Sequence, residues 1–198
     1  MPTAIAIIKD EHRSLAAVLQ GLVWLSGEYR TGRLQPDFRL LAAMFLYIRA
    51  FPERLHHPKE DEFLYRILRE RHAGAAPLLD VLEAEHVSGR RMITELDAAL
   101  TSCQLDSAHD FGAFDELVKA YAEFHWAHMR KEEDVVMPMA EQFFTGEDWQ
   151  EIDAVFRTNA DPLADAGNKK EFRELFRKIV NLAPPPIGVG PAEPPAVA

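Results

Sequence analysis

Cysteine, basic residues and long apolar runs are all scarce in this 198-residue chain. The single cysteine, Cys103, excludes an intramolecular disulfide and a metal site built from thiolates. The 22 basic residues against 32 acidic ones give a net charge of -10, which disfavours nucleic acid and anionic membranes as partners. No apolar run approaches the length of a membrane span, and no basic segment precedes the apolar residues at the start. We therefore expect a protein of the reducing cytoplasm.

The chain is rich instead in apolar residues with helical spacing. Hydrophobic residues make up 47% of the sequence, as in ordinary globular proteins. They recur at intervals of three, four and seven residues, which is the period of an α-helix. The pattern predicts long helices over residues 4–29, 38–72, 78–102 and 111–144, and shorter ones over 147–158 and 169–181. Pro52 and Pro58 predict a kink or bulge within the second long helix.

These elements predict an all-α protein in three parts. Residues 1–144 would form an up-down four-helix bundle, and residues 145–183 would add two short C-terminal helices. The apolar faces of those short helices must cover the bundle or a second subunit, which leaves a homodimer as one expectation. Residues 184–198 hold six prolines and should be extended.

A histidine and a glutamate four residues apart occur twice. His56 and Glu60 form the first pair, and His128 and Glu132 form the second pair 72 residues later. Residues i and i+4 lie on one face of a helix, so each pair can hold one metal ion, or its carboxylate can bridge two. The plain alternative is a pair of surface ion pairs. The repeat and the apolar residues that flank both pairs favour metal.

Two further histidines repeat in the same way. His12 and His86 each follow a glutamate, at a shift of 74 residues, and each lies among inward-facing apolar residues. In an up-down bundle with short loops, residues equally far from a loop lie at the same height. Measured this way, the two lone histidines lie within about one turn of the two His/Glu pairs. A core histidine with ordinary hydrogen bonds is the alternative for each, but the matching heights favour metal ligands.

The resulting six-residue set has the chemistry of a two-metal centre. Buried imidazoles and carboxylates are costly unless they are paired or bind metal. Imidazole with carboxylate suits iron, manganese or zinc rather than calcium or magnesium. Two bridging carboxylates and two histidines for each metal fit a pair of ions about 3.5–4 Å apart. The predicted metal ligands are His12, His56, Glu60, His86, His128 and Glu132.

This order of motifs resembles that of the hemerythrin-like (HHE cation-binding) family over about residues 4–144. The resemblance implies a non-haem di-iron centre with a bridging oxygen species, with Glu60 and Glu132 bridging the ions and the four histidines as terminal ligands. It also implies a small diatomic ligand or peroxide as the exogenous partner. Oxygen-carrying hemerythrins have a fifth histidine where this chain has Arg90. The set is therefore more similar to iron-centre-repair and nitric-oxide-handling di-iron proteins, and to bacterial hemerythrin-like proteins of unassigned role.

Two more histidines lie next to the set. His125 lies on the same helix face as His128 and is either an additional ligand from another helix or a packed, hydrogen-bonded histidine. His57 follows His56 and is rotated about 100° from it on a regular helix, so we expect it at the surface or in a supporting role. A frame shifted by one residue, with His57 and Asp61 as the ligands, is the alternative.

The carboxylates and the remaining histidines carry weaker expectations. Glu11 and Glu85, which precede His12 and His86, are either surface residues or partners of the ligands. The acidic residues that follow Glu60 are expected to face solvent. His72 and His109 lie near helix ends and are expected to be solvated.

Three functions follow from this sequence. The first is a di-iron protein that senses, binds or stores oxygen, nitric oxide or iron. The second is an enzyme whose di-iron centre reduces or disproportionates peroxide or nitric oxide. The third is an interaction module that works through its C-terminal helices and tail. The first is favoured, because no acid–base or nucleophilic set stands apart from the proposed ligands.

Overall fold

Helices make up nearly all of the computed structural model, which describes residues 2–105 and 111–158. The α-helices are α1 (Thr3–Arg30), α2 (Phe38–Ala50), α3 (His57–Lys59), α4 (Arg66–Arg71), α5 (Ala76–Leu105), α6 (Gly112–Lys131), α7 (Met137–Phe143) and α8 (Gly146–Phe156). A 3₁₀ turn, η3 (Ala73–Ala75), precedes α5. Within the described ranges there is no β-strand, so the all-α prediction is confirmed there.

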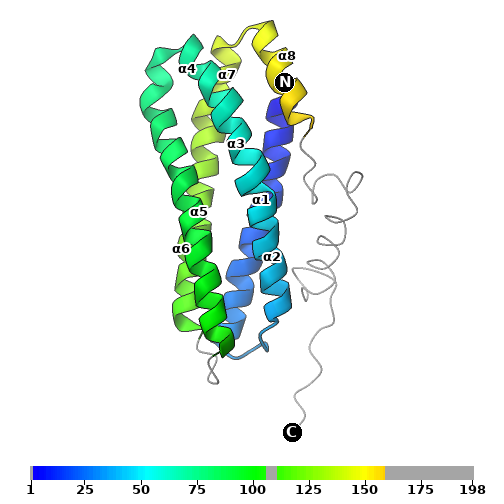
Figure 1. The fold of residues 1–198 in the computed structure, drawn as a ribbon, viewed down its shortest axis with the longest axis vertical. Coiled ribbons are helices and arrows are strands. Elements are labelled where there is room, and N and C mark those ends of the chain that lie inside the picture. The colour runs from blue at the N-terminus through cyan, green and yellow to red at the C-terminus, as the bar shows by residue number, and fades with distance from the viewer. Residues whose placement is uncertain (1, 106–110, 159–198) are drawn as a thin grey trace.

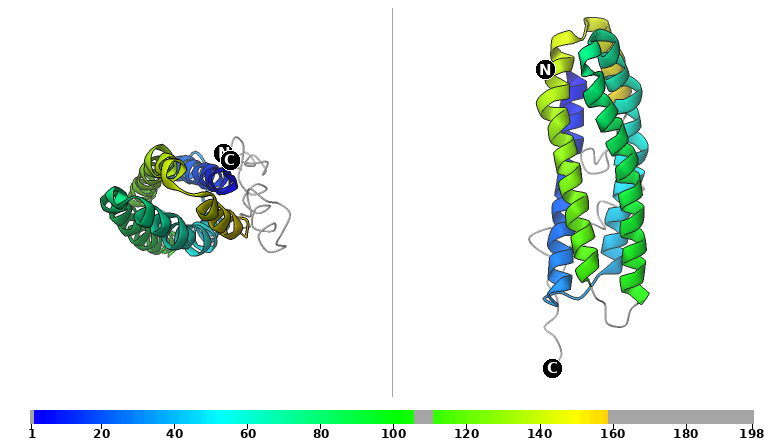
Figure 2. Two further views of the ribbon diagram at one scale, coloured as in Figure 1. Left: turned by 90° about the horizontal axis from the view of Figure 1, so that it is seen from above. Right: turned by 90° about the vertical axis from the view of Figure 1, so that its left-hand side faces the viewer.

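The long helical segments run side by side along the length of the molecule (Figure 1). Helix α1 contacts α2 and α6, and α5 contacts α2 and α6, so the segments surround a common axis when seen from the end (Figure 2). The short helix α8 lies at the end occupied by α4 and α7 and contacts α1. It corresponds to the first short helix that the sequence predicts. The second, over 169–181, and the proline-rich tail lie outside the described residues.

Local sequence signals explain where several helices begin. The carboxylate of Asp37 accepts hydrogen bonds from the backbone N–H groups of Arg39 and Leu40, which caps the start of α2. Thr145 and Asp148 form a reciprocal capping box at the start of α8. No helix in the described ranges is long and apolar enough to cross a membrane.

Three π-helical segments interrupt the long helices. Segments η1 (Pro52–His56) and η2 (Glu60–Tyr65) separate α2, α3 and α4, which confirms the predicted bulge around His56. A third segment, η4 (Glu132–Val136), lies between α6 and α7 and contains no proline. Pro138 follows it at the start of α7 and cannot donate a hydrogen bond to the carbonyl of Asp134, which lies inside the segment. Glu60 and Glu132 each begin a π segment, so the sequence repeat extends to the backbone, at the kind of irregularity that often marks a functional site.

The core is divided into two apolar clusters. One cluster includes Leu19, Phe45 and Phe114, and the other includes Ile8, Leu79 and Val136. In each long segment, the buried histidines lie between residues of one cluster and residues of the other, and so do the buried carboxylates other than Asp115. These histidines and carboxylates thus form a single layer across the molecule, which we call the polar layer.

Candidate metal centre

The six predicted ligands meet in the polar layer. All are buried, with exposed fractions of 3% or less. Glu60 lies between His56 and His86, because its Oε1 is 3.2 Å from the Nε2 of His56 and its Oε2 is 3.6 Å from that of His86. Glu132 lies between His12 and His128, because its Oε2 is 3.3 Å and 3.5 Å from their Nε2 atoms. Each carboxylate therefore faces one histidine from each half of the repeat.

The donor atoms fit metal ions. Two ligand atoms about 2.0–2.1 Å from one ion, at angles of about 90–110°, lie about 2.8–3.4 Å apart. The distances above, and the 3.0 Å between the Nε2 atoms of His86 and His128, fall close to this range. Three carboxylate oxygens, both of Glu60 and Oε2 of Glu132, are buried without a hydrogen-bond donor in the described structure, as is Nε2 of His12. Bound cations would satisfy these otherwise costly groups.

A carboxylate holds the other ring nitrogen of each of the four histidines. The Nδ1 atoms of His12, His56, His86 and His128 lie 2.6–2.9 Å from Glu133, Glu11, Asp61 and Glu85, respectively. Such contacts orient a metal-binding imidazole and raise its basicity. Glu11 and Glu85 are therefore partners of the histidines, each serving the histidine on a neighbouring segment rather than the one that follows it in sequence.

Sequence reasoning did not predict that Asp61 and Glu133 would hold ring nitrogens. Asp61 was expected to face solvent, or to be a metal ligand in the frame shifted by one residue, but it contacts Nδ1 of His86 and its side chain is only 34% exposed. Each residue directly follows a bridging glutamate, and the shift of 72 residues relates one to the other. The repeat thus contained a signal for both, although the partner histidines could be found only from the structure.

Comparison with known proteins agrees with this geometry. The family model for the hemerythrin HHE cation binding domain matches residues 3–140. The chain belongs to this family. Neither the search of curated proteins nor that of solved structures gave a match. Membership implies that this hemerythrin domain binds cations, typically iron, and the buried cluster of histidines and glutamates fits that role.

The hemerythrin domain also buries His57, so its expected surface position is wrong. The exposed fraction of His57 is 2%, and its ring stacks on that of His86 with 4.2 Å between centroids. It lies in α3, between two π segments. A π turn has more residues than an α turn, so successive residues rotate less and both His56 and His57 can face inward. Potential ligand atoms of His57, Glu60, His86 and His128 lie within 4.8 Å of one another.

The remaining histidines lie outside such groups. His125 is 2% exposed, and neither of its ring nitrogens has a hydrogen-bond partner within the described structure. It does not join either group of clustered ligand atoms found among the described residues, one of which contains His57 and the other His12. His72 is half-buried against Phe143 rather than fully solvated. His109 lies outside the described residues.

Electrostatic coupling in the layer is strong. Burial opposes protonation of His56, but the adjacent carboxylates of Glu60 and Glu11 raise its pKa to about 10. Burial likewise opposes protonation of His128, and Glu132 and Glu85 raise its pKa to about 9. Burial opposes ionisation of Glu132, yet the nearby histidines hold its pKa well below the ordinary value. Without metal, protons on these histidines compensate the buried carboxylates.

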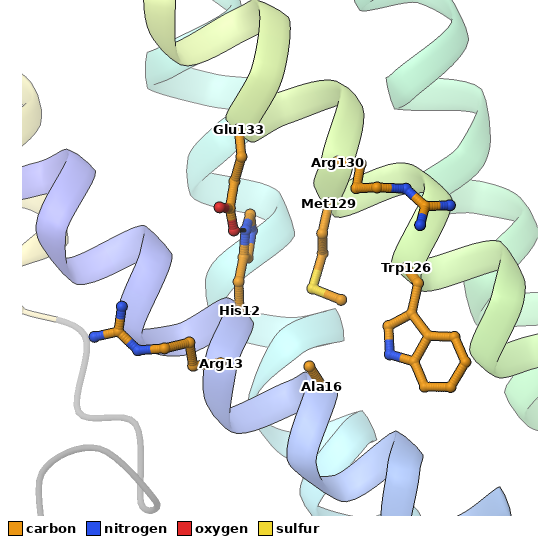
Figure 3. A pocket seen from close by; sticks show the side chains of 7 residues that line it. All are labelled: His12, Arg13, Ala16, Trp126, Met129, Arg130 and Glu133. Atoms are coloured by element: carbon orange, nitrogen blue, oxygen red, sulfur yellow. Dashed lines mark hydrogen bonds and ion pairs between the residues drawn. The ribbon is translucent and has the colours of Figure 1, made fainter.

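A pocket of about 270 Å³ reaches the layer between α1 and α6. It is lined by His12, Arg13, Ala16, Trp126, Met129, Arg130 and Glu133 (Figure 3). The side chains of His12 and Glu133 meet on one side, and Met129 lies between them and Trp126. Arg13 and Arg130 are exposed. A small molecule in this pocket would therefore lie beside one of the candidate ligands.

Proposed function

We propose that this hemerythrin-domain protein holds two iron ions and uses them to bind or sense oxygen, nitric oxide or iron. The supporting observation is the position of Glu60 and Glu132, each between one histidine of either half. Two carboxylates placed in this way suit bridges between two ions, with His12 and His56 on one ion and His86 and His128 on the other. Zinc or manganese would suit the same donors.

The protein's own part is to hold and shield the centre. The long segments, which we propose form an up-down four-helix bundle, bring the ligands from separate helices into one layer. Apolar clusters on both sides exclude water from that layer. The carboxylates at the Nδ1 atoms fix the direction in which each Nε2 points. Bound iron would supply an open position for a small ligand, which the pocket beside His12 can admit.

Anaerobic iron loading tests this function. We expect two ferrous ions per chain, and a change in the absorption spectrum when oxygen or nitric oxide is added. The double variant His56→Ala/Glu132→Ala should abolish iron binding, because it removes a ligand from each half. His72→Ala, which removes a histidine far from the layer, is the matched control and should keep both ions. Full iron content in the double variant would exclude this centre.

A di-iron enzyme acting on peroxide or nitric oxide is the second candidate, and Tyr65 favours it. The buried hydroxyl of Tyr65 donates a short hydrogen bond to Oε1 of Glu132. A tyrosine held at a bridging carboxylate could supply a proton or an electron to a bound substrate. Spectra that form and reverse on ligand removal would indicate a carrier or sensor. Sustained consumption of peroxide or nitric oxide would indicate the enzyme, and Tyr65→Phe should then slow turnover.

The remaining expectations about partners and location stay predictions. They are a cytoplasmic location, a homodimer, and the lack of nucleic-acid or membrane partners. The acidic net charge of -10 supports the last of these. Size-exclusion chromatography with light scattering would measure the oligomeric state directly.

A further inference from the structure

The two halves of the repeat differ at one point inside the polar layer. At the shift of 72 residues that relates the His/Glu pairs, His57 corresponds to Met129 and Glu53 corresponds to His125. All four residues are buried. The first half therefore places a histidine and a carboxylate where the second half places a thioether and a histidine. The ligands proposed above follow the repeat, whereas these two positions break it.

His57 has the surroundings of a ligand. It belongs to the same group of clustered donor atoms as Glu60, His86 and His128. Its Nδ1 lies 3.4 Å from Oε2 of Glu53, so its Nε2 remains available to the centre. The four predicted histidine ligands also have a carboxylate at Nδ1, at shorter distances of 2.6–2.9 Å. His57 and Glu53 thus repeat the arrangement that orients metal-binding imidazoles.

The structure around Glu53 leaves room for this pair. A Cβ atom on Gly89 would lie 3.3 Å from Oε1 of Glu53 and 3.1 Å from the ring of His125, so a larger residue would crowd both side chains. The next residue, Arg90, places Nη1 4.0 Å from Oε2 of Glu53. Glu53 therefore lies between Nδ1 of His57 and the guanidinium of Arg90 at the surface. This nearby positive charge explains how a buried carboxylate can remain next to His57.

Met129, the counterpart of His57, lies in the same pocket as His12, a proposed ligand of the other ion. It is 6% exposed and lines the pocket together with His12. Figure 3 shows its side chain in the space between α1 and α6, next to His12. A thioether is a soft ligand that suits copper(I) and is a poor match for iron held by imidazoles and carboxylates. The position equivalent to that of His57 is thus filled by a side chain that does not hold iron.

We propose that His57 is a fifth terminal histidine ligand, on the ion held by His86 and His128, and that Met129 leaves the equivalent position on the His12/His56 ion open to exogenous ligand. This inference rests on the proposed two-iron function. It names the side of the centre at which a small ligand binds and the pocket through which it arrives.

Iron content and azide binding test the two positions separately. Azide is a small anion that occupies open positions on ferric iron, and its binding is followed by absorption. The wild-type protein should hold two irons and bind one azide per chain. Met129→His should keep both irons and weaken azide binding at least tenfold, because it supplies the missing ligand. His57→Ala should either bind a second azide or lose one iron, and added imidazole should restore the wild-type content and spectrum.

Two control variants make the same chemical changes away from the polar layer. Met139→His on α7 matches Met129→His, and His72→Ala matches His57→Ala. Both controls should show the iron content and azide binding of the wild type. If Met129→His does not fold, judged by circular dichroism, His57→Ala decides alone. Two irons and one azide in His57→Ala, or an iron loss that imidazole does not restore, would overturn the inference. A wild-type protein that fails to hold two irons would instead overturn the proposed function itself.

Discussion

The two halves of the repeat use the same parts in the centre but differ around it. Each half contributes a lone histidine, a His/Glu pair and two carboxylates that hold ring nitrogens. Each bridging glutamate begins a π-helical segment. At the shift of 72 residues the halves differ at two positions, because His57 corresponds to Met129 and Glu53 corresponds to His125. On the functions proposed above, the shared parts would hold the metal, and the differences would decide where a small ligand can approach it.

Removing a shared part should have the largest effect. Glu60→Ala and Glu132→Ala should each lose both irons, because each carboxylate lies between the two groups of histidines. At free iron about a thousandfold above the Kd of each site, the iron-dependent gain in unfolding free energy should fall by about 4 kcal/mol for each lost ion, or about 8 kcal/mol for both. Iron analysis and thermal unfolding with and without iron measure this. Glu141→Ala, an exposed carboxylate of α7, is the control, and a variant that keeps both irons would contradict the bridging role.

Much of this shared centre could be predicted from the sequence. The spacing of apolar residues predicts the long helices, and equal distances from the loops predict that His12, His56, His86 and His128 lie at one height. These predictions succeed because they depend on helix rise and period, which vary little. The family resemblance is confirmed by the match over residues 3–140.

The differences between the halves could not be predicted in the same way. The inward position of His57 depends on how far a π turn rotates, and a fixed helical period does not include that rotation. The roles of Asp61 and Glu133 depend on contacts between neighbouring helices. The bulge at Glu132 contains no proline, and Pro138 after it does not indicate where the bulge begins, in contrast to Pro52, which begins the first π segment. These features require the packed structure.

The stability of the metal-free protein should depend on pH in two ways, because the polar layer contains histidines paired with carboxylates and histidines that are buried without a charge. His56 and His128 have pKa values raised to about 10 and about 9, above the ordinary 6.5, so their stabilising contribution is full below pH 6.5 and is lost as pH rises through 9–10. Burial and neighbouring histidines lower the pKa values of His57 and His125, and their contribution is lost as pH falls below 6.5.

Urea unfolding of the metal-free protein should therefore show maximal stability near neutral pH. At about 1.4 kcal/mol per pH unit and group, the two raised pKa values set an upper limit of about 8 kcal/mol on the stability lost by pH 10, and the coupling between the groups lowers that loss. Bound iron replaces the protons on His56 and His128, so the iron-loaded protein should lose much less. Equal alkaline losses with and without iron would contradict the pairing.

Tyr65 gives a smaller asymmetry, because its counterpart at the shift of 72 residues is Met137. The hydroxyl of Tyr65 donates to Glu132, whereas neither oxygen of Glu60 has a hydrogen-bond donor in the described structure. In the metal-free protein, Tyr65→Phe should lower the unfolding free energy by about 1–3 kcal/mol, because a buried acceptor loses its donor. Met137→Leu should cost less than about 1.5 kcal/mol. Similar costs for the two variants would show that this hydrogen bond contributes little.

Arg90 should have the smallest effect, although it stands where oxygen carriers have a histidine. Its side chain is 46% exposed and lies 4.0 Å from Glu53, so its ion pair should contribute less than about 1 kcal/mol. At the shift of 74 residues that relates His12 to His86, its counterpart is Ala16, so Arg90→Ala makes the two halves alike at this position. We expect the variant to keep both irons and to unfold within about 1 kcal/mol of the wild type. Loss of one iron would instead mean that His57 depends on Arg90 through Glu53, and the centre would extend to the surface on that side.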